Sequence, residues 1–296
     1  MRVAQRTKKP EPLTLSFDKQ PVMTEFIEAV RLGKAKEIAV YGARGDGKSC
    51  GSLTAIVAHA QEHHRQGFEL PTRWLAVRDS FANHKISTIE TLKKSLWQGA
   101  WKITGQEHRA FFVAGDPPQI LTQLDLLGVD DQQAKDKLKL EVHGIWFEEA
   151  APSSYLGSSG VDEDSWLIAL TSARLPSHTN VCLLTTNYPD FDHWTWQRFV
   201  IEKAEGTLYF RIPPGERASP EQRAQWSKAL RGRADLEKRL LLGEPGTTLL
   251  GQPVATGFSL DSNVSATRLI PRYGDALGFG FDFGLCPSCI IGANVG

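Results

Sequence analysis

A glycine-rich motif is the strongest chemical signal in the sequence. It directly follows an apolar run, Ile38–Tyr41, and precedes a segment with helical character. Glycines let the backbone turn its N–H groups toward an anion, and a helix start adds the positive end of its dipole. Lys48 would contact the β- and γ-phosphates of a nucleoside triphosphate, and the Ser49 hydroxyl would bind Mg²⁺. The predicted phosphate-binding loop consists of Gly42, Ala43, Arg44, Gly45, Asp46, Gly47, Lys48 and Ser49.

Two adjacent carboxylates end a second apolar run. Leu140–Ala150 reads L-E-V-H-G-I-W-F-E-E-A, so Glu148 and Glu149 directly follow a predicted strand. Successive side chains of a strand point to different sides, and we expect the two carboxylates to have different tasks. Glu148 would hold Mg²⁺, directly or through water, and Glu149 would orient and deprotonate a water molecule. Without a phosphate-binding loop upstream, a solvated helix start would be the alternative.

Polar residues that could respond to a nucleotide occur at two other places. The apolar run Val181–Leu184 ends in Thr185, Thr186 and Asn187, whose hydroxyl and amide groups can change partners when a γ-phosphate leaves. A plain turn before the following proline is the alternative there. Gln20 lies one predicted helix and one strand ahead of the loop, where its amide can pair with both the donor and the acceptor edges of adenine. Without that context, a surface residue would be the alternative.

The elements that must position these residues alternate between strands and helices. This alternation predicts an α/β fold with a mostly parallel sheet flanked by helices. One helix after Asp79 is expected to bury a stripe of Ile86, Ile89, Leu92 and Leu96. The other predicted helices run from Pro21 to Gly33, from Lys48 to about Gly67 and from about Glu163 to Arg174, and the other predicted strands are Arg73–Val77, Ala110–Val113 and Ile120–Leu127.

Composition and charge narrow the class of protein. The 296 residues contain 34 Lys and Arg against 34 Asp and Glu, so any contact with nucleic acid must be local. No apolar run approaches the roughly 18 residues of a membrane span, and the N-terminus lacks the apolar core of a signal peptide. We therefore expect a cytoplasmic protein without membrane contact.

Cysteines and histidines give weaker signals. Cys286 and Cys289 have the spacing of a zinc knuckle or a redox pair, but two buried strand thiols are the favoured interpretation. His59 and His63 could share one helical face and bind zinc, although a solvated helix face is favoured.

Four pieces in this order resemble the large terminase subunit of tailed bacteriophages, the ATPase motor that packages DNA into capsids. They are Gln20, Gly42–Ser49, Ile145–Ala150 and Leu184–Asn187. The resemblance implies a P-loop ATPase with a Walker A loop, a Walker B strand and a coupling motif. It therefore implies ATP and Mg²⁺ as ligands.

The resemblance also implies roles for single residues. Gln20 would bind adenine, and Arg44 would touch the γ-phosphate and stabilise charge in the transition state. Glu149 would be the catalytic glutamate, and Thr185–Asn187 would couple hydrolysis to movement. Glu148 departs from the family, in which aspartate is usual at this position.

Three domains follow from the resemblance. Residues 1–206 would form the ATPase domain with a basic N-terminal arm over residues 1–12, and residues 207–272 a lid or linker subdomain that includes Tyr209–Ile212. From residue 217 to 239 basic side chains outnumber acidic ones by seven to three, which suits DNA, a neighbour's phosphates or a solvated helix. Residues 273–296 would begin a truncated RNase H-like nuclease domain, with Asp282 as its first metal-binding carboxylate. Because such a site needs several carboxylates, we expect no DNA cleavage by this chain.

The implied function is translocation of double-stranded DNA into a procapsid, driven by ATP hydrolysis. The implied partners are the portal protein, the small terminase subunit and further copies of the chain in a ring, in the host cytoplasm and transiently on procapsids. An arginine supplied by a neighbouring copy would be Arg174, Arg231 or Arg239. A helicase or another nucleic-acid-dependent ATPase is the closest alternative. A small-molecule kinase shares the P-loop, and a GTP-dependent switch lacks support because no Asn-Lys-x-Asp signature occurs.

Overall fold

A computed structural model of the chain describes residues 17, 19–93, 100–104, 108–130, 136–151, 160–214, 219–246, 277–282 and 288–293. The chain forms two compact units, residues 1–248 and residues 249–296. Several predicted features lie outside the described residues, namely the arm over residues 1–12, Leu96, Arg217 and Cys286. Within the described ranges, no helix has both the length and the apolar character that a membrane crossing requires.

Strands and helices alternate along much of the first unit, as the sequence predicts. Its strands are β1 (Glu37–Tyr41), β2 (Thr72–Arg78), β3 (Trp101–Thr104), β4 (Arg109–Ala114), β5 (Gln119–Gly128), β6 (Gly144–Glu148), β7 (Val181–Thr186) and β8 (Thr207–Arg211). Its helices and helical turns are α1 (Pro21–Leu32), α2 (Lys48–Arg65), α3 (Phe81–Asn83), η1 (His84–Thr88), α4 (Ile89–Lys93), η3 (Lys137–Lys139), α6 (Glu163–Ser172), α7 (Trp194–Trp196), η4 (Gln197–Ile201), α8 (Pro220–Ala229), α9 (Ala234–Glu237) and η5 (Lys238–Leu242).

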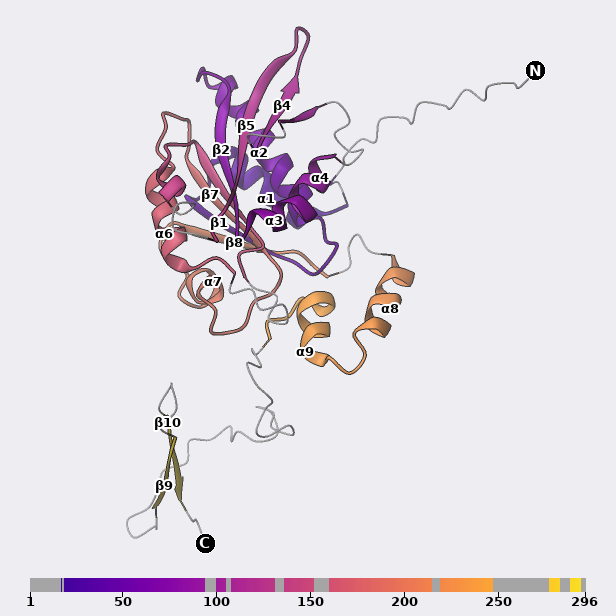
Figure 1. Cartoon of the computed structure of the whole chain (residues 1–296), viewed down its shortest axis with the longest axis vertical. Helices are drawn as coiled ribbons and strands as arrows, with labels where there is room; N and C mark the ends of the chain where they lie inside the picture. Colours follow the sequence, from indigo (N-terminus) through magenta and orange to yellow (C-terminus); the bar gives the residue numbers. More distant parts are fainter. Residues whose placement is uncertain are drawn as a thin grey trace, which may run out of the picture. The chain divides into compact units, whose positions relative to one another are not determined.

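An eight-stranded sheet forms the centre of the first unit (Figure 1). The strand order is β3-β4-β5-β2-β6-β7-β1-β8. From β5 to β8 in this order the neighbouring strands run parallel, whereas β3, β4 and β5 are joined antiparallel. The predicted α/β fold with a mostly parallel sheet is therefore confirmed. Since β1, β6 and β7 are parallel neighbours, the phosphate-loop motif and both polar strand ends meet at the same edge.

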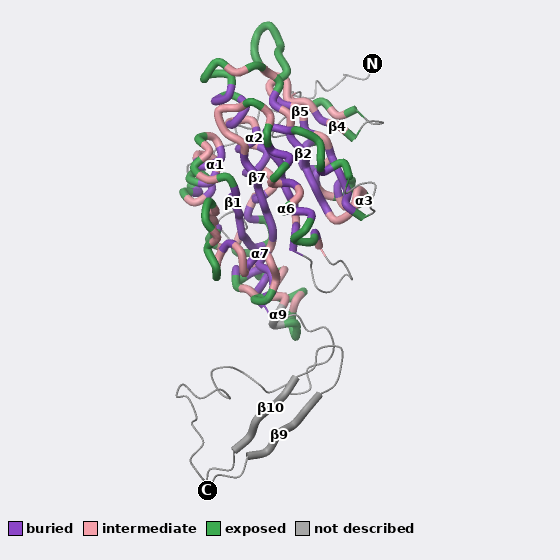
Figure 2. Tube along the Cα trace, turned by 90° about the vertical axis from the view of Figure 1, so that its left-hand side faces the viewer, coloured by how far each residue is buried: buried purple, intermediate pink, exposed green. Residues whose placement is uncertain are grey.

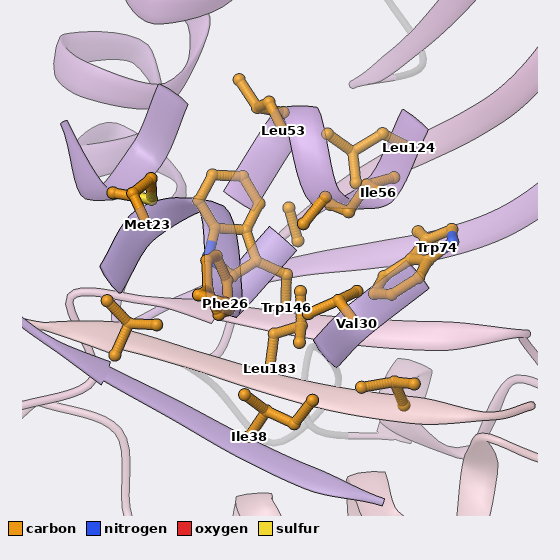
Figure 3. Packing of buried hydrophobic residues seen from close by; sticks show 14 of the residues in the cluster. Met23, Phe26, Val30, Ile38, Leu53, Ile56, Trp74, Leu124, Trp146 and Leu183 are labelled. Atoms are coloured by element: carbon orange, nitrogen blue, oxygen red, sulfur yellow. The ribbon is translucent and has the colours of Figure 1, made fainter. Parts of the chain in front are cut away.

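Helices cover both faces of this sheet, and each face has its own core. Phe26 of α1 packs in the first core together with residues of α2 (Figure 3), and Trp166 of α6 packs in the second. Neighbouring residues of β6 point to opposite faces of the sheet: Trp146 packs in the first core and Phe147 in the second. The strands β1 and β7 are buried along their whole length (Figure 2), and so is β6, as parallel strands with two covered faces must be.

The first helix confirms the predicted start and stop signals. Pro21 is the first residue of α1, where its missing N–H costs nothing. Gly33 ends the helix with φ 62°, a left-handed conformation. A Cβ at Gly33 would lie 2.2 Å from Thr179 Oγ1, so both the backbone and the space require glycine.

The prediction of one regular helix after Asp79 is wrong, because the segment changes its helical repeat partway along. The π-helical turn η1 separates α3 from α4 and inserts hydrogen bonds of longer span than those of an α-helix. As a result Ile86 is 75% exposed, whereas Leu92 is 2% exposed. The apolar stripe that regular helical spacing predicts is therefore broken at Ile86.

Strand β8 corrects the predicted start of the lid. We expected Tyr209–Ile212 to belong to a lid subdomain beginning at residue 207, but β8 pairs parallel with β1, and Tyr209 lies opposite Ala39. Ile212 then donates its N–H to the Tyr41 carbonyl at 2.8 Å. The sheet thus continues to Arg211, and the helices α8, α9 and η5 follow it.

The second unit contains an antiparallel pair of strands, β9 (Leu277–Asp282) and β10 (Ser288–Ala293). Asp282, the predicted nuclease carboxylate, is the last residue of β9 and lies opposite Ser288. Cys289 is part of β10, while Cys286 lies outside the described residues. The nuclease domain stays a prediction.

Candidate nucleotide site

The phosphate-loop motif joins β1 to α2, as predicted. Gly45 and Gly47 have φ angles of 84° and 82°, which are accessible to glycine at little cost. Gly47 immediately precedes the helix, and the Gly51 N–H donates to its carbonyl at 2.8 Å. Ser49 is therefore the second residue of α2, with its hydroxyl at the helix start. This arrangement presents backbone N–H groups and a helix N-terminus to one place, which suits an anion.

Lys48 is fixed within the loop. Its Nζ donates to the carbonyls of Gly42 and Ala43 and to Asn187 Oδ1, each at 2.9 Å. Burial lowers the pKa of Lys48, and the nearby Glu149 carboxylate opposes that shift. The ammonium group is thus held by the backbone of its own loop and by the residue that follows β7.

Asn187 connects Lys48 to Glu149. Its Nδ2 donates to Glu149 Oε2 at 3.2 Å, while its Oδ1 accepts from Lys48. The Glu149 backbone has φ 57°, an uncommon conformation for a residue with a side chain, and its N–H donates to the Thr185 carbonyl at 2.6 Å. Three residues predicted from separate parts of the sequence therefore form one chain of contacts, from the phosphate loop to the end of β6.

Glu148 faces the other neighbouring strand. Its side chain is 2% exposed, and Oε2 accepts a short hydrogen bond from the Thr88 hydroxyl. Arg78 Nη1 lies 3.4 Å from the same oxygen and also donates to Ser87 Oγ. The sequence reasoning missed Arg78 and Thr88. The available signal was the position of Arg78 at the carboxyl end of an apolar strand.

The oxygen donors near the loop fit Mg²⁺. Ser49 offers a hydroxyl, and Glu148 and Glu149 offer carboxylates, the ligand types that this ion prefers. The two carboxylates have different contacts, since Glu148 meets Arg78 and Glu149, just beyond the end of β6, meets Asn187.

The two threonines of the predicted coupling motif have structural contacts. Thr185 Oγ1 accepts from Trp146 Nε1 at 2.7 Å, and Thr186 Oγ1 accepts from the Ala151 N–H at 3.1 Å. The Thr186 carbonyl also accepts from the Gly42 N–H at 3.3 Å. Of the three residues, Asn187 is the one whose side chain reaches the loop lysine.

Gln20 lies at the start of α1 and is 5% exposed. Its Nε2 is buried and has no hydrogen-bond partner among the described residues. Three residues later, Met23 approaches Gly51 so closely that a Cβ at Gly51 would lie 2.1 Å from its sulfur. The start of α1 is therefore near the first turn of α2, and the unsatisfied amide suits a hydrogen-bonding ligand there.

The tip of the loop contacts the segment after β8. The Arg44 N–H donates to the Leu240 carbonyl at 2.8 Å, and the Arg44 side chain is exposed. A Cβ at Gly45 would lie 3.0 Å from the Trp226 ring, so the glycine lets this indole approach. Helix α8 and turn η5 thus both contact the phosphate loop.

The structure separates the candidates for an arginine supplied by a neighbouring copy. Arg239 is wrong for this role because it is 4% exposed, donates from Nε to the Tyr188 carbonyl at 2.9 Å and pairs with Asp190 at 3.2 Å. Arg174 pairs with Glu141 near the amino end of β6, opposite the edge that carries Glu148. Arg231 is exposed.

The predicted solvated face of His59 and His63 is also wrong. These side chains are 0% and 1% exposed, and their rings pack with those of His143 and His178. Burial lowers the pKa of His59 to about 3 and that of His143 to about 4, so these two rings are neutral at pH 7. Within the described part of the chain, no group of His, Cys, Asp and Glu side chains has the geometry of a metal site.

Similarity to known proteins comes from structure. No protein-family model and no curated protein sequence matches the chain. The large terminase of a thermophilic bacteriophage superposes with a TM-score of 0.54 at 14% identity, covering 76% of this chain and 53% of that one. The same terminase in complex with ADP gives a TM-score of 0.52 at 14% identity, covering 93% of this chain and 64% of that one. This chain thus spans between about half and two thirds of the length of these terminase structures, and it has their α/β fold.

Proposed function

We propose that the first unit is the ATP-hydrolysing motor of a viral DNA-packaging terminase. The observation that carries the proposal is the continuous contact from Lys48 through Asn187 to Glu149. It joins the phosphate loop, the end of β7 and the end of β6, the three places from which an ATPase must bind phosphate, respond to it and activate water. The ADP complex of the thermophilic phage terminase supports an adenine nucleotide as the ligand.

In the proposed reaction, Glu149 accepts a proton from a water molecule as the water oxygen bonds to the γ-phosphorus. The bond from that phosphorus to the β–γ bridging oxygen breaks, and ADP and phosphate leave. Lys48 and the loop N–H groups bind the phosphate oxygens, and Arg44 stabilises the charge of the transition state. Gln20 supplies its unsatisfied amide to adenine.

Mg²⁺ would be held by Ser49 and Glu148, and it would supply positive charge to the β- and γ-phosphates. Thr185, Thr186 and Asn187 would transmit the loss of the γ-phosphate. Asn187 is the residue best placed for this, because one amide group contacts both Lys48 and Glu149.

The wider assembly is also part of the proposal. Double-stranded DNA would be moved into a procapsid by a ring of copies that contact a portal protein and a small terminase subunit, in the host cytoplasm and transiently on procapsids. Arg231 would be the arginine supplied to the neighbouring copy. The segment after Arg211 would act as the lid or linker, and β9 with Asp282 would belong to a nuclease domain beginning near residue 273.

ATP turnover against protein concentration, with and without duplex DNA, tests the proposal. We expect Glu149→Gln to lower turnover at least about 100-fold while ADP binding persists, because a general base contributes on this order. Glu141→Gln is the matched control, since Glu141 is an exposed carboxylate at the opposite edge of the sheet. Turnover that survives in Glu149→Gln would refute the catalytic assignment.

A second assay separates a packaging motor from a helicase. Displacement of a third strand from a triplex reports movement along duplex DNA, and release of one strand from a tailed duplex reports unwinding. We expect ATP-dependent triplex displacement without strand separation. Strand separation by the wild type would favour the helicase alternative.

A further inference from the structure

A buried polar cluster surrounds Glu148 on the side away from β7. We call Arg78, Ser87 and Thr88 the Glu148 clamp. The Thr88 hydroxyl donates a hydrogen bond to Glu148 Oε2, and Arg78 Nη1 lies 3.4 Å from the same oxygen. The side chains of Arg78 and Glu148 are 10% and 2% exposed, so water screens this pair little.

The clamp is held from three neighbouring strands. Arg78 ends β2, Glu148 ends β6, and Thr88 is connected to β5 through His84. His84 Nδ1 lies 2.9 Å from Thr88 Oγ1, and His84 Nε2 lies 3.0 Å from the Leu127 carbonyl. Both His84 and Thr88 are 0% exposed, so packing fixes the position of the Thr88 hydroxyl.

The π-helical turn places both hydroxyls of the clamp. Ser87 and Thr88 are the last two residues of η1: Ser87 donates to the Asn83 carbonyl of the preceding turn at 3.1 Å, and Thr88 donates to Glu148. Ser87 Oγ in turn accepts from Arg78 Nη1. Consecutive side chains of a regular α-helix diverge by about 100°, so a widened turn is a local feature that permits both contacts.

The geometry points to a positioning role for Thr88 and Arg78 in metal binding, an inference that rests on the proposed ATPase function. The hydrogen bonds of Glu148 among the described residues are all on Oε2, which assigns this oxygen to the clamp and leaves Oε1 for a cation. The Arg78 guanidinium lies on the Oε2 side of Glu148 as well, so both clamp contacts orient the carboxylate in the same way. Thr88 and Arg78 therefore set the affinity for Mg²⁺ and leave the binding of the nucleotide itself unchanged.

Calorimetric titration of ADP in EDTA and in Mg²⁺ tests this inference with Thr88→Val and Thr88→Ser. Valine keeps the shape and removes the hydroxyl, and serine restores the hydroxyl. We expect Thr88→Val to bind ADP in EDTA as the wild type does and to lose about tenfold of the affinity gained from Mg²⁺, a typical effect of removing a residue that orients a metal ligand. Thr88→Ser should retain the gain.

ATP turnover supplies a second readout. In Thr88→Val the Mg²⁺ concentration for half-maximal turnover should rise about tenfold, and turnover at saturating Mg²⁺ should return to the wild-type value. If Thr88→Val does not fold, Thr88→Ala replaces it, because it leaves space rather than a methyl group against the carboxylate. An unchanged Mg²⁺ gain in a folded variant overturns the inference alone. Failure of the wild type to bind ADP in either condition overturns the proposed function as well.

Discussion

The buried ion pair of Arg239 and Asp190 gives the sharpest test of how the segment after β8 is attached. The side chains are 4% and 6% exposed, and Arg239 also donates to the Tyr188 carbonyl. Arg239→Met removes the charge and keeps most of the stem, which lies against Gly246, where a Cβ would be 2.8 Å from Arg239 Cδ. The substitution therefore isolates the loss of the guanidinium.

Removing one partner of a buried pair costs about 3–5 kcal/mol in the free energy of unfolding, because the other charge is left without compensation. For a unit of this size that corresponds to a fall in Tm of roughly 10 °C. Burial already raises the pKa of Asp190, and Arg239 opposes that shift. In Arg239→Met the pKa rises further, so the folded state gains a proton more readily than the unfolded state. The deficit relative to wild type should therefore shrink as the pH falls below the pKa of Asp190.

Urea unfolding at several pH values measures this effect in Arg239→Met, in Asp190→Asn and in the double variant. The double variant should recover much of the loss, because no charge then remains buried. Arg174→Met is the matched control: its pair with Glu141 is 59% and 56% exposed, so we expect a change below about 0.5 kcal/mol. A loss below about 1 kcal/mol in Arg239→Met, or strictly additive effects in the double variant, would refute the reasoning.

Two further predictions concern pH and backbone conformation. The pKa values of His59 and His143 are lowered to about 3 and about 4, so the unfolded state binds protons first, and the free energy of unfolding should fall as the pH drops from about 6.5 toward those values. Urea titrations of wild type and His59→Gln measure it, and an equal pH slope in both would contradict this origin. Gly45→Ala should cost about 1–2 kcal/mol and weaken ADP binding, because Gly45 has φ 84° and the new Cβ would approach the Trp226 ring to 3.0 Å. Gly67→Ala is its control, with φ 87° and open space, and equal ADP affinity in the two variants would contradict the expectation.

The sequence predicted the part of the site that follows from strand ends. Lys48, Glu149 and Asn187 each come after an apolar strand, and parallel neighbouring strands bring their carboxyl ends to one edge. Their mutual contacts follow from this topology. The two ends of helix α1 were also predictable, because Pro21 and Gly33 act through local backbone geometry.

Features that depend on long-range packing could not be predicted in this way. The exposure of Ile86 depends on the π-helical turn, and the residue pattern of this segment did not predict such a turn. His59 and His63 have polar side chains, but the packing of α2 on the sheet buries them against the rings of Trp74 and His143. The contact of Arg78 with Glu148 requires the pairing of β2 with β6, which is known only once the strand order is known. The same holds for β8, whose place beside β1 gives the sheet its last strand.

The attachments of the segment between Ile212 and Gly246 constrain how it could move relative to the sheet. The Ile212 N–H donates a hydrogen bond to the Tyr41 carbonyl, just before the phosphate loop. Gly246 forms an isolated β-bridge with Asp190, which follows the end of β7. Between these two ends the segment also contacts the tip of the phosphate loop, because the Arg44 N–H donates to the Leu240 carbonyl and the Trp226 ring lies against Gly45. Helix α8 and turn η5 therefore cannot move relative to the sheet without a change in their contacts at the tip of the loop. A displacement of α8 would thus change the surroundings of Arg44 and Gly45, and a change in the loop would act on α8 in turn.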